Sequence, residues 1–187
     1  MRQAQTLNEN QLRRVLHYCR TRRHAKRDQT IILFSFYAGL RASEIAALKY
    51  SDVFDCEGRV RNQFVLSTSQ SKGGRTRTVY VNQRLRKALA EYAQQQHSKP
   101  HLPLFCSQKG GAFSANTMCQ LFLDIYKAVG LKDASSHSGR RTYITRLANA
   151  GVGVRVLAEL AGHSHISTTQ RYIDVNSDQL TAAVELL

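Results

Sequence analysis

Two residues near the C-terminal end of the chain, His163 and Tyr172, flank a polar Ser/Thr segment that is typical of a turn followed by a short helix. A lone tyrosine most often packs in a core, and its phenol becomes a nucleophile only when neighbouring groups activate it. The upstream sequence contains two arginines, a lysine and a second histidine that could do so: Arg41, Arg140, Lys72 and His137. Together these are the groups needed to attack a phosphodiester without a metal.

The charge balance of the chain indicates a polyanionic partner. Lysine and arginine number 27 and aspartate and glutamate 13, so the net charge is +14. Nucleic acid is the commonest partner of such a domain, and a basic but inert surface is the alternative. The 187 residues are enough for one domain with its own hydrophobic core.

Several classes of protein are disfavoured by what the sequence lacks. We find no apolar run of membrane-spanning length and no signal-peptide core, so we expect a cytoplasmic protein without membrane contact. The four cysteines are scattered without zinc-type pairing, and we expect no disulfide, no metal and no cofactor: Cys19, Cys56, Cys106 and Cys119.

The first half of the chain must position Arg41. Thr6 and Glu9 have the spacing of a capping box, and apolar residues at helical spacing follow from Leu12 to Cys19. Residues 30–38 are apolar nearly all round and predict a buried helix that ends at Gly39. Arg41 then lies at the start of a short helix with Glu44 one turn on, a pair that could equally be a surface ion pair.

A small β-structure is expected to present Lys72. Residues 53–66 and 76–81 alternate in hydrophobicity like strands, with a turn at residues 55–58. Gly73 and Gly74 favour a tight hairpin between them, which would leave Lys72 exposed. The alternative for Lys72 is an ordinary solvated loop charge.

The second half of the chain reads as a series of helices. We expect helices over residues 82–96, 114–129 and 154–160, and a last amphipathic helix over 177–187. Ser135 and Ser136 can cap a further helix, which would place His137 and Arg140 on one face of its first turn. An anion is favoured there, although a satisfied histidine beside a surface arginine is the simpler alternative. The pattern predicts an α+β fold, mostly helical, with a small antiparallel sheet on one edge.

The ordered set of motifs resembles the catalytic domain of the tyrosine recombinases, the phage-integrase family, whose pattern is Arg…Lys…His-x-x-Arg…His/Trp…Tyr. The matching stretches are the Gly-Leu-Arg-Ala-Ser-Glu run at 39–44, Lys72, His-Ser-Gly-Arg at 137–140, Leu-Ala-Gly-His at 160–163, and Ser-Thr-Thr-Gln-Arg-Tyr at 167–172. Two positions depart from the family: Gly139 stands where a larger apolar residue is frequent, and Arg141 where a second histidine is frequent.

The resemblance implies a role for each of these residues. Tyr172 would be the nucleophile and Lys72 the general acid. Arg41 and Arg140 would clamp the phosphate, and Glu44 would orient a neighbour, either Arg41 or His137. His137 and His163 would hydrogen-bond the phosphate or help to move the proton of Tyr172. We further expect three arginines to contact DNA: Arg75, Arg77 and Arg141.

The resemblance also implies partners and a domain arrangement. The expected activity is site-specific recombination of double-stranded DNA, in a protein of bacterial or phage origin, by a tetramer that assembles through the helix at 177–187. Residues 1–187 would form a single catalytic domain without the N-terminal core-binding domain that most members carry. The protein would be either a compact recombinase, like the fimbrial-switch enzymes, or an isolated domain. The alternative functions are DNA relaxation, as in type IB topoisomerases, and DNA binding without catalysis.

Overall fold

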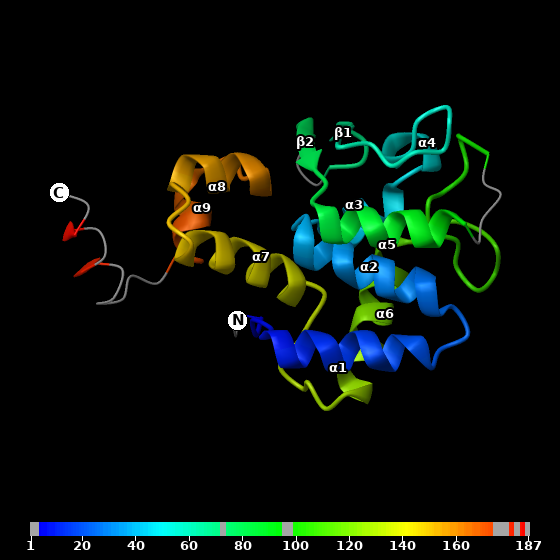
Figure 1. Ribbon diagram of the computed structural model, residues 1–187, viewed down its shortest axis with the longest axis horizontal. Coiled ribbons are helices and arrows are strands. Elements are labelled where there is room, and N and C mark those ends of the chain that lie inside the picture. The colour runs from blue at the N-terminus through cyan, green and yellow to red at the C-terminus, as the bar shows by residue number, and fades with distance from the viewer. Residues whose placement is uncertain (1–3, 72–73, 95–98, 174–179, 182–183, 186–187) are drawn as a thin grey trace.

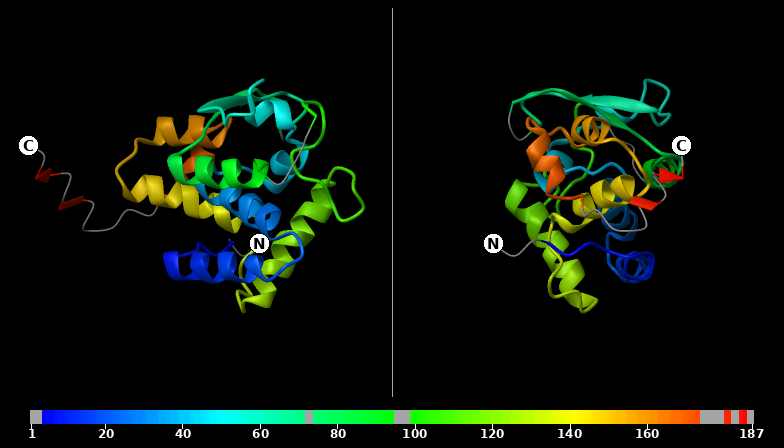
Figure 2. Two further views of the ribbon diagram at one scale, coloured as in Figure 1. Left: turned by 45° about the vertical axis from the view of Figure 1, so that its right-hand side comes forward. Right: turned by 90° about the vertical axis from the view of Figure 1, so that its left-hand side faces the viewer.

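The computed structural model describes residues 4–71, 74–94, 99–173, 180–181 and 184–185. Helices dominate it, and a two-stranded antiparallel sheet lies at the edge of the helical body farthest from α1 (Figures 1 and 2), so the predicted α+β class is confirmed. The elements are α1 (Glu9–Arg20), α2 (Ala25–Tyr37), α3 (Ala42–Ala47), α4 (Tyr50–Val53), β1 (Gln63–Leu66), β2 (Arg77–Tyr80), α5 (Gln83–Ala93), α6 (Ala115–Ala128), α7 (Ser138–Asn149), α8 (Val154–Ala161) and α9 (Ile166–Gln170).

The predicted first helix is present, but its cap lies two residues later than expected. Asn8, not Thr6, is the N-cap, and it forms a capping box with Gln11 rather than with Glu9. The reason is that Leu7 is buried and its N–H donates to the Thr142 hydroxyl, so the chain is still extended at that point.

Helix α2 forms the centre of the molecule and packs against α1, α5 and α7. It begins at Ala25, five residues before the predicted start, because its first turn buries the charged residues Arg27 and Asp28 as an ion pair. Its two phenylalanines, Phe34 and Phe36, are enclosed in the core. The helix ends at Tyr37, and Gly39 turns the chain with a φ of 64°.

The β-structure is shorter than predicted. Residues 50–53 form helix α4, and only Gln63–Leu66 and Arg77–Tyr80 pair as strands, with Phe64 opposite Val79. The predicted turn at 55–58 is present, closed by a bridge between Phe54 and Val60. Phe64, Leu66 and Val79 face the core, as the alternation predicted.

The remaining helices confirm the predicted periodicity with small shifts of their ends. Asn82 and Ser114 cap α5 and α6, and left-handed Gly130 follows α6. Helix α7 starts after His137, and neither Ser135 nor Ser136 is its N-cap. In the described residues no helix has the length and hydrophobicity to cross a membrane. The predicted helix at 177–187 lies largely outside the described residues.

Candidate active site

The first arginine of the pattern lies at the N-terminus of α3, held by a buried carboxylate. Arg41 donates through its backbone N–H to Glu44 Oε2 at 2.8 Å and through its guanidinium to Glu44 Oε1 at 2.7 Å. The Glu44 side chain is fully buried and that of Arg41 is 19% exposed. The pair is therefore part of the interior, not the surface ion pair that its spacing alone would allow.

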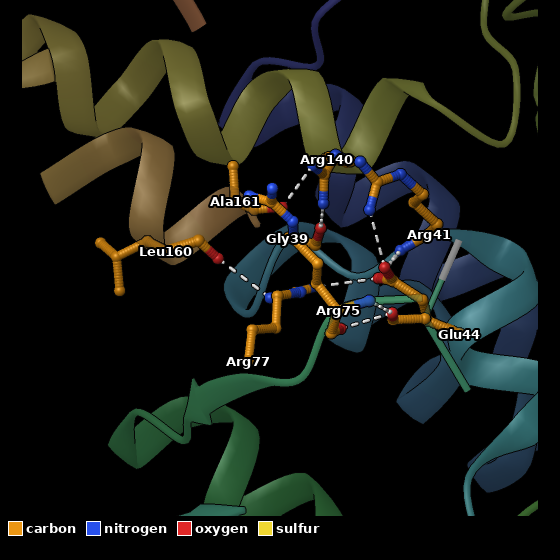
Figure 3. Close-up of polar contacts among 9 residues, drawn as sticks. Gly39, Arg41, Glu44, Arg75, Arg77, Arg140, Leu160 and Ala161 are labelled. Atoms are coloured by element: carbon orange, nitrogen blue, oxygen red, sulfur yellow. Dashed lines mark hydrogen bonds and ion pairs between the residues drawn. The ribbon is translucent and has the colours of Figure 1, made fainter. Parts of the chain in front are cut away.

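The same carboxylate binds a second arginine from the sheet. Arg77 of β2 donates to Glu44 Oε2 at 2.7 Å and to the carbonyl oxygen of Leu160 at 2.9 Å (Figure 3). Sequence analysis assigns Arg77 to DNA, but its side chain is only 5% exposed and its guanidinium is already bound. The alternation of the strand could have revealed this, because Arg77 has the same parity as the buried Val79.

Gly162 makes room for Arg77. It ends α8 in the left-handed conformation, with a φ of 63°. A Cβ atom at this position would lie 2.3 Å from Cδ of Arg77, so any other residue would displace that side chain. The glycine therefore serves both the turn before His163 and the path of Arg77 to Glu44.

Arg140 enters the same cluster from α7. Its guanidinium donates to the carbonyl oxygens of Gly39, at 2.7 Å, and Ala161, at 2.5 Å, and the residue is 3% exposed (Figure 3). Burial, together with the nearby charges of Arg41 and Arg77, lowers the pKa of Arg140 to about 9, while Glu44 and Tyr172 act in the opposite direction. Arg140 thus remains charged at neutral pH but is held by carbonyl dipoles alone.

Positive charge is in excess in this cluster. Among the described residues, three guanidiniums converge and Glu44 is the only buried carboxylate with them. Burial alone would raise the pKa of the Glu44 carboxyl, but Arg77, the Arg41 amide and the Arg41 guanidinium outweigh it and leave that pKa below its usual value. A buried excess of cations is unfavourable unless an anion binds, and a phosphate suits the planar arginine donors.

His163 and Tyr172 lie together beside the arginines. Their rings are nearly parallel, with centroids 5.7 Å apart and an interplanar angle of 20°. The Tyr172 carbonyl oxygen accepts a 3.4 Å bond from the Thr145 hydroxyl, which connects the end of α9 to α7. Burial and the charges of Arg140, Arg41 and Arg77 lower the pKa of His163 to about 4, so its imidazole is neutral at pH 7.

A small open pocket joins these groups. Arg41, Glu44 and Arg77 line it from one side, and Gly162 and His163 from the other. Exposed Arg75 and Glu159 complete its rim. Arg41 and His163, which are far apart in sequence, thus line one small pocket, whereas Arg140 and Tyr172 lie next to His163 but outside the pocket lining.

The other predicted site residues lie around this centre or outside the described chain. His137 is exposed at the N-cap of α7, one turn before Arg140. Arg141, also assigned to DNA, is half-buried, and Lys72 is outside the described residues. Packing explains the glycine at position 139, because a Cβ atom there would lie 2.6 Å from the Ser35 hydroxyl oxygen.

No metal ligand set accompanies the cluster. Searching the described residues for groups of His, Cys, Asp and Glu that could hold an ion gives none. The residue that sequence analysis left without a role is Thr169, which is fully buried and hydrogen-bonds His163 Nδ1 at 2.8 Å.

The sequence matches the model of the phage integrase family over residues 5–179. Among curated proteins it is 30% identical over 161 residues to tyrosine recombinase XerA of Pyrococcus furiosus, covering 85% of this chain and 54% of that protein. It is 33% identical over 162 residues to tyrosine recombinase XerC of Rhodospirillum centenum, covering 85% and 46%. The chain therefore spans about half the length of the curated relatives it matches.

Two solved structures show the same fold. A crystal structure of XerA recombinase superposes with a TM-score of 0.78 at 24% identity, covering all of this chain and 66% of the other. The Tn1549 transposon integrase in complex with circular intermediate DNA gives a TM-score of 0.80 at 22% identity, covering 99% and 67%.

Proposed function

The chain belongs to the phage integrase family, and we propose on this basis that it cuts and rejoins double-stranded DNA at a specific site through a covalent tyrosine intermediate. The observation that carries the proposal is the excess of buried arginine charge beside Tyr172. Arg41 and Arg140 belong to the family pattern, and both lie in a cluster that favours binding of a phosphate. The relatives named as recombinases support the same activity.

The proposed reaction has two symmetrical halves. The Tyr172 oxygen attacks the scissile phosphorus while its proton passes to solvent, directly or through a histidine of the pattern. A 3′-phosphotyrosyl bond forms, and the bond to the 5′ oxygen breaks. The leaving 5′ oxygen takes a proton from Lys72, which becomes neutral. A 5′-hydroxyl of another strand then attacks the phosphotyrosine and restores the phosphodiester, so the bond energy is conserved without ATP.

The arginine cluster would supply the electrostatic part of catalysis. Negative charge builds up on the non-bridging oxygens in the transition state. The guanidiniums of Arg41 and Arg140 are planar and permanently charged, so they can donate hydrogen bonds to these oxygens. Glu44 would keep Arg41 and Arg77 in place before DNA arrives. Because arginine charge can do this work, the chemistry does not require Mg²⁺.

The proposed partners are DNA and further copies of the chain. Exposed Arg75 at the pocket rim and half-buried Arg141 are the arginines we propose for DNA phosphates, whereas buried Arg77 is proposed as a support for Glu44. The family resemblance further suggests a tetramer on DNA, assembled through residues 177–187. Because the proposed substrate is DNA, we also propose a cytoplasmic location.

Covalent trapping tests the function. We would incubate the protein with a pool of nicked duplexes, in which the short fragment with the new 5′-hydroxyl diffuses away, and look for a denaturant-resistant protein–DNA adduct. We expect an adduct with the native chain and none with Tyr172→Phe, which keeps the ring beside His163. An equal adduct in both would exclude Tyr172 as the nucleophile.

The same preparation separates the alternative functions. Relaxation of a supercoiled plasmid that has no partner site would favour a topoisomerase-like enzyme. Salt-sensitive DNA binding without any adduct, on duplexes from which a full-length relative does form one, would favour a binding protein without catalysis.

A further inference from the structure

Thr169 is the fully buried neighbour of His163. Its hydroxyl lies 2.8 Å from His163 Nδ1, and the two residues are held by different parts of the same turn, since His163 follows α8 and Thr169 belongs to α9. A hydrogen bond to one ring nitrogen of a histidine fixes the orientation of the ring. The same bond decides which of the two ring nitrogens carries the proton.

The surroundings of Thr169 decide the direction of this bond. Among the residues that the structure describes, the Thr169 hydroxyl has no other hydrogen-bond partner. If His163 donated from Nδ1, the buried hydroxyl proton would have no acceptor, which is costly. If Thr169 donates to Nδ1, both groups are satisfied and the imidazole proton is on Nε2.

We propose that Thr169 is a positioning residue that holds His163 as the Nε2–H tautomer, so that His163 donates a hydrogen bond to the scissile phosphate and does not take the proton of Tyr172. The inference rests on the proposed function, and it chooses between the two roles that sequence analysis leaves open for this histidine. His163 keeps one proton throughout the reaction. The proton of Tyr172 therefore passes to solvent, directly or through exposed His137.

The charges around His163 support a donor rather than a base. As a base, His163 would become an imidazolium beside Arg41, Arg77 and Arg140, which already outnumber the buried carboxylate. Its pKa of about 4 lies far below that of a phenol, so it would accept that proton poorly. A neutral Nε2–H adds a donor for the phosphate without adding charge.

A double-mutant cycle on adduct formation tests the role of Thr169. Thr169→Val removes the hydroxyl at nearly constant shape, and we expect it to slow adduct formation about tenfold, the worth of one hydrogen bond. Thr169→Ser should restore most of the rate, and Thr168→Val, at the half-buried neighbouring position, should leave it unchanged. In a His163→Gln background, Thr169→Val should have little further effect. Equal losses from Thr169→Val with and without His163 would overturn the proposal.

The tautomer can be measured independently of DNA cleavage. In ¹⁵N-labelled protein, two-bond proton–nitrogen correlations identify the protonated ring nitrogen, and His163→Gln identifies the signals among the 7 histidines. We expect the proton on Nε2, in the native chain and in Thr169→Ser. A proton on Nδ1 would overturn the inference even if the protein cleaves DNA. A native chain that gives no adduct but shows Nε2–H would contradict the proposed function and leave the Thr169–His163 arrangement supported.

Discussion

The described part of the chain contains two buried clusters in which one carboxylate holds two arginines, and one of these two has the character of an active site. Asp28 binds Arg27 at 2.8 Å and Arg22 at 2.7 Å, much as Glu44 binds Arg41 and Arg77. In the Asp28 cluster both guanidiniums also lie over aromatic rings, and Arg27 donates to the Cys106 carbonyl oxygen. The Glu44 cluster differs by one additional cation, Arg140, whose hydrogen-bond partners among the described residues are carbonyl oxygens.

The comparison shows that a buried arginine–carboxylate pair is by itself a structural feature. Such pairs satisfy their own charges, and they connect elements that are distant in sequence. What distinguishes a binding site is charge left uncompensated after these pairs have formed. Both clusters border a pocket, but they differ in what else their arginines contact. Around Asp28, with two arginines on one carboxylate, both guanidiniums also lie over aromatic rings, whereas around Glu44 there are three arginines and His163 shares their pocket.

The largest effect should come from removing the unbalanced cation. We expect Arg140→Gln to reduce the rate of adduct formation about 1000-fold, because it removes a charged donor to the transition state. Single-turnover cleavage of a nicked duplex measures this rate. Arg140→Lys should recover only a small part of the native rate, since the lysine ammonium lacks the planar, two-pronged donor geometry of a guanidinium. A tenfold loss or less for Arg140→Gln would mean that the two clusters do not differ as described.

Neutralising each carboxylate in turn makes the comparison direct. Glu44→Gln and Asp28→Asn should each lower the free energy of unfolding by about 3 kcal/mol, as expected when one partner of a buried ion pair is removed. Glu44→Gln should also slow adduct formation about 100-fold by releasing Arg41 and Arg77, whereas Asp28→Asn should change it less than about threefold. Urea unfolding and cleavage at a temperature where both variants are folded give the two quantities.

Two glycines with the same backbone conformation test the path of Arg77. Gly162 and Gly74 have φ values of 63° and 66°, but a Cβ at Gly162 would meet Arg77 at 2.3 Å and one at Gly74 would meet nothing within 4 Å. Gly74→Ala should cost about 1 kcal/mol from backbone strain alone, and Gly162→Ala about 3 kcal/mol. Thermal unfolding measures the loss of stability in each variant. Equal losses for Gly74→Ala and Gly162→Ala would show that the contact with Arg77 contributes nothing.

The smallest effect is a pH dependence of stability. Because the folded pKa of His163 is about 4, the unfolded chain binds a proton at higher pH than the folded chain does. Stability due to this residue is therefore complete above about pH 6.5, the unfolded pKa, and falls as the pH is lowered toward 4. We expect a loss of about 1 to 2 kcal/mol over this window, allowing for partial exposure, and His163→Gln should remove that part of the slope.

Much of this protein follows from the residue order alone. The spacing of apolar residues predicts most of the helices and the hairpin, because a helix or strand needs only a local periodicity to bury one face. The motif positions from Arg41 to Tyr172 follow from the resemblance to the tyrosine recombinases, not from periodicity. Where the local signal was weak the prediction failed, as at α4, a short helix that was not predicted and whose last residue, Val53, was read as the start of a strand, and at the cap of α1.

Tertiary structure alone decided how the predicted groups are paired. Arg77 is separated from Glu44 by 33 residues and Arg140 from Gly39 by 101, and no local pattern indicates such contacts. The role of Thr169 likewise depends on the turn that brings it against His163. Residue types determine which charges and hydrogen bonds are available, but whether a buried charge is compensated depends on which distant elements pack together. In the described part of this chain, that packing leaves Arg140 paired with carbonyl oxygens and not with a carboxylate.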